Sequence, residues 1–204
     1  QIKSVAYNQP EWLSFYVWST QTVLKARFYL KGGTTSDIVV AQGADFDPNC
    51  IYSVNVQFSR IWSLGTGDRY GMFDVWVEDG SGKVYTYTQR YVLDTSGDER
   101  TVLVARNSLG GIDTFSFLGS MERSAEAEHT NVMRGETMYS GLVDMTRTYT
   151  VNTGILSGHG RDWVWDLQRS PQAWVLMDGA LRGIVMLAPA VTASMYEDST
   201  GTVD

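Results

Sequence analysis

The sequence predicts an all-β protein built from two antiparallel β-sandwich-like domains, the second carrying one short α-helix and a long polar β-ribbon. Seven Trp and eleven Tyr stand among 204 residues, and aromatic side chains favour the half-buried surfaces of strands. Twenty Gly and only four Pro suit many tight turns. Segments of alternating polarity are short and are separated by turn sequences, which is typical of an antiparallel β fold.

The clearest strand pattern lies at residues 52–58, where Tyr52, Val54, Val56 and Phe58 alternate with polar residues. Further strands are predicted at 12–18, 23–30, 38–41, 72–78 and 83–92, and the last two flank a DGSG turn at 79–82. About six closely spaced strands without a helix between them favour a sandwich. The polar segment at 94–100 places the domain boundary, giving domains 1–95 and 96–204.

The second domain is predicted to begin with a hairpin of strands 101–105 and 114–118. Its turn starts at Asn107 and contains Gly110 and Gly111, whose positive φ angles would allow a tight reversal. Residues 121–137 are highly polar, and 122–129 lacks the continuous apolar stripe of a helix, so most of 121–143 is not predicted to be helical. They predict a ribbon that is polar on both faces, or a loop, which gains order from a neighbouring chain. Residues 147–152 (RTYTVN) are again strand-like.

Residues 157–170 contain the best helix pattern, with the helix itself expected at about 160–169 and stopped by Pro171. Trp163, Val164 and Leu167 share one face, while Trp165 points roughly the opposite way. Such a helix is packed on two sides or contacts another subunit. Strands at 173–177 and 184–187 around a DGALRG turn, then a strand at 190–195, complete the prediction.

Charge and cysteine content exclude several classes of partner and site. The formal net charge is −7 and the basic residues are scattered singly, which does not suit a nucleic-acid groove. No apolar run approaches the roughly 20 residues that cross a bilayer, so no membrane partner is expected. The chain starts at Gln1 without a signal-peptide pattern, which indicates a trimmed or excised segment. Cys50 is alone, so neither an internal disulfide nor a thiolate metal cage is expected.

No catalytic or cofactor-binding residues are predicted, so we expect no enzyme activity. The sequence has no G-x-S-x-G nucleophile motif, and His129 and His159 lie outside metal-binding spacings. Two pairs of acids have the residue types of glycoside hydrolysis, but solvated strand faces explain them better. These pairs are Asp74/Glu78 and Glu126/Glu128.

One weak calcium candidate remains at Asp45, Asp47 and Asn49, which place oxygen ligands at alternate positions. The later glycine and glutamate of a calcium loop are missing. A turn in which Asx side chains bond their own backbone, with Pro48 fixing φ, explains the same residues better.

The aromatic residues of the first domain offer an alternative function, a carbohydrate-binding or adhesin module. A row of exposed rings on one sheet would stack against sugars, although filling the core is the commoner use of such rings. Trp62, between Ile61 and Ser63 in a loop rich in Gly, is the best candidate for an exposed ring. The predicted platform comprises Trp12, Trp18, Trp62, Trp76, Tyr70, Tyr85 and Tyr87.

A resemblance to a known group rests on three motifs in residues 102–185. These are the NSLGGIDTFSF hairpin at 107–117, the RTYTVNTG segment at 147–154, and a Trp-bearing helix that ends at Ser170-Pro171. Together they resemble uncharacterised structural proteins of tailed phages and prophages of gut Bacteroidetes-type bacteria. The resemblance implies a virion protein of a tail, baseplate or fibre attachment, assembled in the host cytoplasm.

The expected partners are other copies of the chain and other virion proteins, because sheet edges in such assemblies are completed by neighbours. The predicted interface lies on the ribbon and on the helix. Its residues are Glu122, Arg123, Glu126, Arg134, Trp163 and Trp165.

Overall fold

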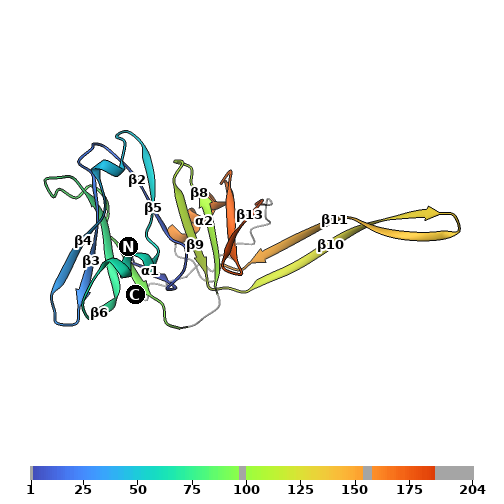
Figure 1. The fold of residues 1–204 in the computed structure, drawn as a ribbon, viewed down its shortest axis with the longest axis horizontal. Coiled ribbons are helices and arrows are strands. Elements are labelled where there is room, and N and C mark those ends of the chain that lie inside the picture. Colours follow the sequence, from blue (N-terminus) through green and yellow to red (C-terminus); the bar gives the residue numbers. More distant parts are fainter. Residues whose placement is uncertain (1, 97–99, 154–157, 187–204) are drawn as a thin grey trace, which may run out of the picture.

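A computed structural model describes residues 2–96, 100–153 and 158–186, and it confirms the predicted all-β class. Figure 1 shows a layered body from which one long hairpin projects. The sheets contain the following strands, in spatial order. The five-stranded sheet is β1 (Ile2–Val5), β7 (Gln89–Leu93), β6 (Arg69–Glu78), β3 (Val23–Leu30) and β4 (Thr35–Gln42), and a two-stranded sheet pairs β2 (Trp12–Tyr16) with β5 (Ile51–Asn55). The four-stranded sheet is β13 (Ala180–Ile184), β12 (Ala173–Met177), β8 (Thr101–Arg106) and β9 (Ile112–Phe117).

The first core lies between the five-stranded sheet and the β2–β5 pair. Strand β3 turns Leu24, Ala26 and Phe28 inward, and β6 contributes Phe73 and other apolar residues at alternate positions. This alternation is the period of two that a sheet with one buried face requires. Pairing is antiparallel throughout except between β1 and β7, which run parallel. Strand β1 lies outside the strands that the sequence predicts.

A short helix, α1 (Phe58–Leu64), closes one end of this core and replaces part of a predicted strand. The alternation at 52–58 correctly predicted β5, but the strand ends at Asn55. Phe58, Ile61 and Trp62 then follow helical spacing, and the first two are almost fully buried. Phe58 fits both periods, and this ambiguity made the predicted strand too long.

The second core lies between the four-stranded sheet and the helix α2 (Gly158–Gln168), close to the predicted helix. Leu167 of α2 packs among Leu103, Phe115 and Val175. All five residues from Thr101 to Ala105 are buried. Leu103 and Ala105 share the second core with Leu167 of α2, and Val102 lines a pocket together with Gln9 and Pro10 of the N-terminal segment. The two cores lie on either side of residues 94–100, and independent folding of the two halves stays a prediction.

Two other predicted strands have different bounds in the structure. The strand expected at 83–92 is reduced to β7, and Val84 makes only an isolated bridge to Glu78. The last hairpin reverses within Asp178-Gly179, whose φ angles of 52° and 75° form a two-residue turn, so β13 begins at once. The strand predicted at 190–195 falls outside the described residues.

Residues 121–151 form the hairpin of β10 (Met121–Arg134) and β11 (Thr137–Val151), here called the ribbon. At about 3.4 Å per residue, its fourteen residues in β10 extend about 45 Å from the body (Figure 1). Gly135, with φ of 67°, makes the turn at its tip. At its base, a Cβ on Gly119 would lie 2.0 Å from the carbonyl oxygen of Asn152, so only glycine fits there. The predicted ribbon is therefore confirmed in preference to a loop.

Candidate functional site

A polar junction joins the two halves of the body. Lys3 is ion-paired with Glu11 and donates to the carbonyl oxygen of Thr114 on β9 at 2.7 Å. Ser14 donates to the carbonyl oxygen of Ile112 and accepts from its amide, both at 2.8 Å. Burial raises the pKa of the Glu11 carboxyl, although Lys3 and Gln9 oppose the effect. The polar groups of the junction bind one another through ion pairs and hydrogen bonds, as expected of a structural connection between the two halves.

The turn after β8 packs against this junction and explains its second glycine. Gly110 has the positive φ of 89° that the turn requires, as predicted. Gly111 is needed for a different reason, because a Cβ there would lie 2.6 Å from the Cβ of Ser14. The close approach of β2 to this turn therefore excludes a side chain at position 111.

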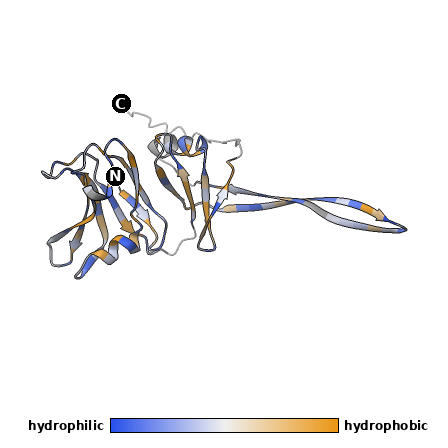
Figure 2. Ribbon diagram, turned by 45° about the horizontal axis from the view of Figure 1, so that its top comes forward, coloured by the Kyte–Doolittle hydropathy of each residue, from blue (hydrophilic) through white to orange (hydrophobic). Residues whose placement is uncertain are grey.

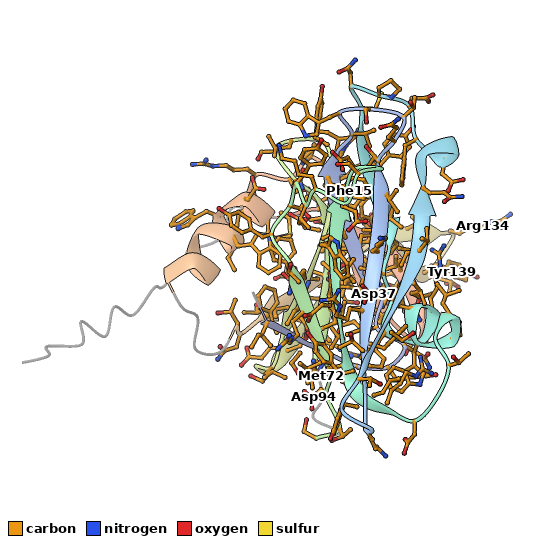
Figure 3. The ribbon with its side chains drawn as sticks, turned by 90° about the vertical axis from the view of Figure 1, so that its left-hand side faces the viewer. Phe15, Asp37, Met72, Asp94, Arg134 and Tyr139 are labelled. Atoms are coloured by element: carbon orange, nitrogen blue, oxygen red, sulfur yellow. The ribbon has the colours of Figure 1, made fainter. Side chains whose placement is uncertain are left out.

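The outer face of the five-stranded sheet, which Figure 3 views towards β3 and β4, carries alternating charges. Across neighbouring strands the order is Asp37, Arg27, Asp74 and Arg90. Arg27 makes two hydrogen bonds of 2.7 Å to Asp37, and Arg90 makes bonds of 2.6 and 2.7 Å to Asp74. Each charge on this ladder thus has a partner of opposite sign within the chain.

The carboxylates of the Asp74/Glu78 pair are both held in their ionised form. Burial favours neutral Asp74, but hydrogen bonds from Arg90 and Tyr29 outweigh it and lower its pKa. Glu78 is likewise affected first by burial, yet Lys25 at 2.5 Å lowers its pKa. A glycosidase needs one carboxyl with a raised pKa as its general acid. This pair does not provide one.

Trp62 does not occupy the exposed loop that the sequence predicted. It lies in α1, half-buried, with its ring stacked on Phe58 at 5.4 Å between centroids. The guanidinium of Arg69 lies 3.9 Å from the centre of the same ring. Helical periodicity turns this ring towards the core, so the expectation of an exposed Trp62 is wrong.

The other predicted platform residues are dispersed. Trp76 is buried and Trp12 half-buried, while Tyr70, Tyr85 and Tyr87 are exposed on β6 and on the segment that follows it. Trp18, just after β2, is 68% exposed and makes an edge contact with Tyr16 at 4.6 Å. Among the described rings, no two of the predicted seven contact each other. Of the four tryptophans in this group, Trp18 has the most exposed side chain.

The three oxygen-bearing residues of the calcium candidate have separate local hydrogen bonds. Asp45 accepts from the amide of Gln42 at 3.1 Å, in the capping box of a short 3₁₀ helix. Asp47 accepts from the hydroxyl of Tyr52, and Asn49 accepts from the hydroxyl of Tyr16 at 3.0 Å. The part of the chain that the structure describes contains no group of three or more His, Cys, Asp or Glu placed to hold a metal.

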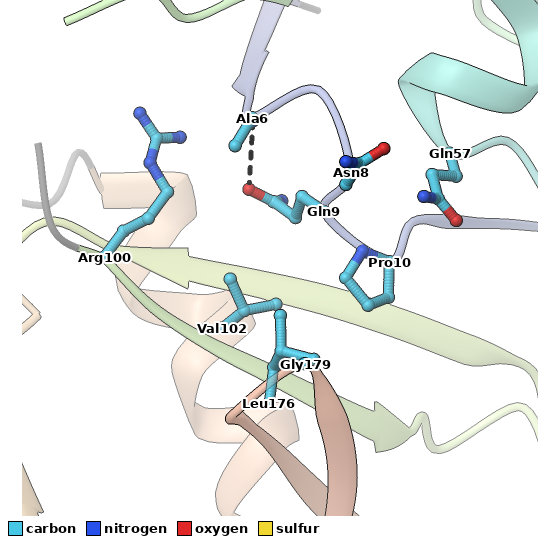
Figure 4. A pocket seen from close by; sticks show the side chains of 9 residues that line it. All are labelled: Ala6, Asn8, Gln9, Pro10, Gln57, Arg100, Val102, Leu176 and Gly179. Carbon is cyan, nitrogen blue, oxygen red and sulfur yellow. Dashed lines mark hydrogen bonds between the residues drawn. The ribbon is translucent and has the colours of Figure 1, made fainter. Parts of the chain in front are cut away.

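A pocket of about 490 Å³ opens where the N-terminal segment meets the four-stranded sheet (Figure 4). Two of its polar residues are engaged within the chain: Arg100 is ion-paired with Asp94, and Gln9 accepts from the amide of Ala6 at 3.3 Å. The described residues that line it include no carboxylate, thiol or imidazole. The lining residues are Ala6, Asn8, Gln9, Pro10, Gln57, Arg100, Val102, Leu176 and Gly179.

The helix α2 separates its tryptophans as predicted. Trp163 packs on Phe115 at 4.7 Å, and its indole nitrogen donates to Asp113 at 3.3 Å. Trp165 is 52% exposed on the other side. Trp163 is thus used inside the chain, and Trp165 is the ring of the predicted interface that a partner can reach. His159 also lies in α2, but its side chain falls outside the described part of the structure.

The ribbon is the most exposed element of the described chain. Glu122, Arg123, Glu126 and Arg134 of the predicted interface are all exposed on β10, as is His129. Hydrophobic residues gather towards the tip, which Figure 2 shows. Four of them have exposed fractions between 56% and 66%, and they are Val132, Met133, Met138 and Tyr139.

Comparisons with protein-family models, with curated proteins and with solved structures each found no match for this chain. Within the described residues, no helix has the length and apolar character needed to cross a membrane.

Proposed function

We propose that this chain is a structural assembly protein of a phage particle, a component of its tail, baseplate or fibre attachment. The ribbon is its docking element. The assignment to a phage particle rests on the sequence resemblance of residues 102–185. The supporting observation from the fold is the ribbon, which carries exposed apolar side chains about 45 Å from the body.

An element of this kind gains its stability from a neighbour. A lone two-stranded hairpin is marginal in water, and it leaves a row of unpaired backbone groups along each outer edge. No described strand pairs with the outer edge of β10 or β11. Docking on another subunit would shield the apolar tip from solvent and hold the hairpin in place. The body, whose outer sheet face carries the internally paired charges of the ladder, serves as the support.

The test is recovery of the chain in particles. The tagged chain is expressed in the phage-producing host, either intact or with residues 125–147 replaced by Asn-Gly. This replacement joins Ser124 to Thr148, which are directly opposed, through a turn that suits a hairpin. We expect the intact chain in purified particles and the shortened chain in the soluble fraction.

A matched control is Tyr87→Ser, which changes a 98% exposed side chain on the body and should leave incorporation unchanged. Absence of the intact chain from the particles would overturn the proposal.

A second candidate function is glycan binding, and the exposed Tyr16–Trp18 pair favours it. Two adjacent aromatic rings, one 68% exposed, offer a stacking surface for a sugar, and Asn49 is hydrogen-bonded to Tyr16 beside them. A glycan array tests this candidate. Binding that is lost in Trp18→Ala and kept in Tyr87→Ser would support it, and no binding by the intact chain would contradict it.

A further inference from the structure

We infer that the partner of the ribbon is the ribbon of a second copy of this chain, packed face to face and antiparallel about a two-fold axis. The inference rests on the proposed assembly function and names the occupant of the docking element. It follows from the strand register, from the distribution of charge on the ribbon, and from the places where apolar side chains lie.

The register divides the ribbon into two unlike faces. Residues directly opposed across an antiparallel pair lie on the same face, and the face alternates along each strand. One face, here called the methionine face, carries Met121/Val151, Arg123/Tyr149, Ala125/Arg147, Ala127/Met145, His129, Asn131/Ser140 and Met133/Met138. The opposite face carries four acids, many threonines and one apolar pair near the tip, Val132/Tyr139; its other members are Glu122/Thr150, Ser124/Thr148, Glu126/Thr146, Glu128/Asp144, Thr130 and Arg134/Thr137.

A bulge keeps the methionine face continuous. The register shifts by one residue of β11 between Glu128 and His129, so the pairing passes from Asp144 directly to Leu142. This shift brings Met138 to the same face as Met145. The guanidinium of Arg147 lies 3.9 Å from the sulfur of Met145, as expected for neighbours on one face.

The methionine face is complementary to itself when two copies run antiparallel. With the two-fold axis beside Ala127, the tip residues Met133 and Met138 of one copy lie over Met121 and Val151 of the other. Val151 is half-buried at the rim of the second core, so the two methionines would extend that core. Arg123 and Tyr149 then face the polar pair Asn131 and Ser140, and the small Ala127 faces its own copy.

The parallel arrangement is less favourable. It would place Arg123 and Arg147 of the two copies at the same level of the interface, where like charges repel. The antiparallel arrangement separates these arginines along the ribbon. Both arrangements leave the four acids of the opposite face in solvent, so the arginines decide between them. The charge pattern therefore favours the antiparallel pair.

The area of contact predicts a weak dimer. From Met121 to Met133 the face is about 40 Å long and about 10 Å wide, or about 400 Å² on each copy. Stable interfaces bury about 1,200–2,000 Å² in total, so this contact alone belongs to the transient class. We expect dimers only at high protein concentration, or in a particle where neighbours are held close.

Crosslinking tests the face. In a Cys50→Ser background, Ala127→Cys places a thiol on the methionine face, and Glu126→Cys places one on the opposite face of the same strand. With a short bismaleimide reagent at high protein concentration, we expect crosslinked dimers of the Ala127→Cys chain and none of the Glu126→Cys chain. The Met145→Glu substitution should abolish these dimers in the Ala127→Cys chain, and Thr146→Glu should not.

Orientation is tested with Met121→Cys and Met133→Cys chains that differ in tag length. An antiparallel pair gives crosslinks only when the two chains are mixed. Crosslinks within each chain alone would indicate a parallel pair and overturn the inference, as would equal crosslinking of both faces or no crosslinking at all. Failure here with the intact chain still present in particles would leave the proposed function standing and assign the ribbon to a different protein.

Discussion

The charge ladder of the five-stranded sheet and the ribbon both place charged side chains on neighbouring antiparallel strands, yet the two regions differ in how those charges are paired. On the sheet, Arg27 and Arg90 each make two hydrogen bonds to an aspartate on a neighbouring strand. On the ribbon, no described pair of directly opposed residues joins a cation to an acid, and Glu128 faces Asp144. The sheet pairs these charges within one chain, whereas the charged residues of the ribbon have no directly opposed partner of opposite sign.

The largest effect is expected at the junction that holds the body together. Lys3→Met leaves the buried Glu11 without its cation, and breaking such a pair costs about 3–5 kcal/mol of unfolding free energy. Urea denaturation measures the loss. Because folding raises the pKa of Glu11, the protonated carboxyl favours the folded state. This contribution is fully present below the ordinary pKa of about 4.3, and it is lost as the pH rises through the higher pKa of the folded protein.

The variant should therefore lose most stability towards neutral pH. Equal destabilisation at every pH would contradict this account of Glu11. A matched control is Lys31→Met, whose lysine pairs with Asp68 on the exposed surface and should change stability by less than about 1 kcal/mol.

The next effect separates the two tryptophans that the sequence placed together on a sugar platform. Trp62→Ala should cost about 3 kcal/mol, because its ring packs on Phe58 at the edge of the first core. Trp18→Ala should cost less than about 0.5 kcal/mol, because Trp18 is mostly exposed. Thermal or urea unfolding of both variants measures the difference. Similar losses would show that exposure does not distinguish the two sites.

A smaller effect is expected on the charge ladder. Asp74→Asn removes the carboxylate that accepts hydrogen bonds from Arg90 and Tyr29. The free energy of unfolding at pH 7 should fall by about 1.5 kcal/mol, which is the low end for hydrogen bonds to a charged group, because Arg90 is partly solvated. The pKa of Asp74 is lowered by folding, so its contribution is present above the ordinary value of about 3.9 and is lost as the pH falls below it.

The acid limb of the stability curve should accordingly be shallower in Asp74→Asn than in the parent chain. Urea midpoints between about pH 2 and pH 5, the range that spans the ordinary pKa, measure it. An unchanged acid limb would mean that the ladder contributes nothing through Asp74.

The smallest effect is expected on the ribbon, where a missing ion pair can be supplied. Asp144→Lys places a cation opposite Glu128 and should stabilise the local pairing by about 0.5 kcal/mol. Amide hydrogen exchange should slow around Glu128, while the global unfolding free energy stays unchanged. Slower exchange throughout the body, or faster exchange in the ribbon, would contradict the contrast between the two regions.

Local sequence patterns predicted the elements that a single period describes. Alternation located β3, β5, β8 and β12, and the Trp163–Leu167 spacing located α2. Phe58 was misread because it satisfies both the strand and the helix period. Because the predicted strand ran through Phe58, Trp62 was assigned to an exposed loop and not to α1. A side chain that fits two periods is assigned only by what it packs against, which for Phe58 is Trp62 and Phe73.

By itself, the sequence determined the all-β class, the turns and the polar ribbon, because these depend on neighbours a few residues apart. The tertiary structure decided the parallel pairing of β1, the junction around Glu11 and the division of the ribbon into two faces. The two faces of the ribbon show why the tertiary structure was needed. Met145, Tyr149 and Val151 stand at odd positions of β11 and Met138 stands at an even one, and only the bulged pairing of β11 with β10 brings these four residues to one face, with Tyr139 on the other.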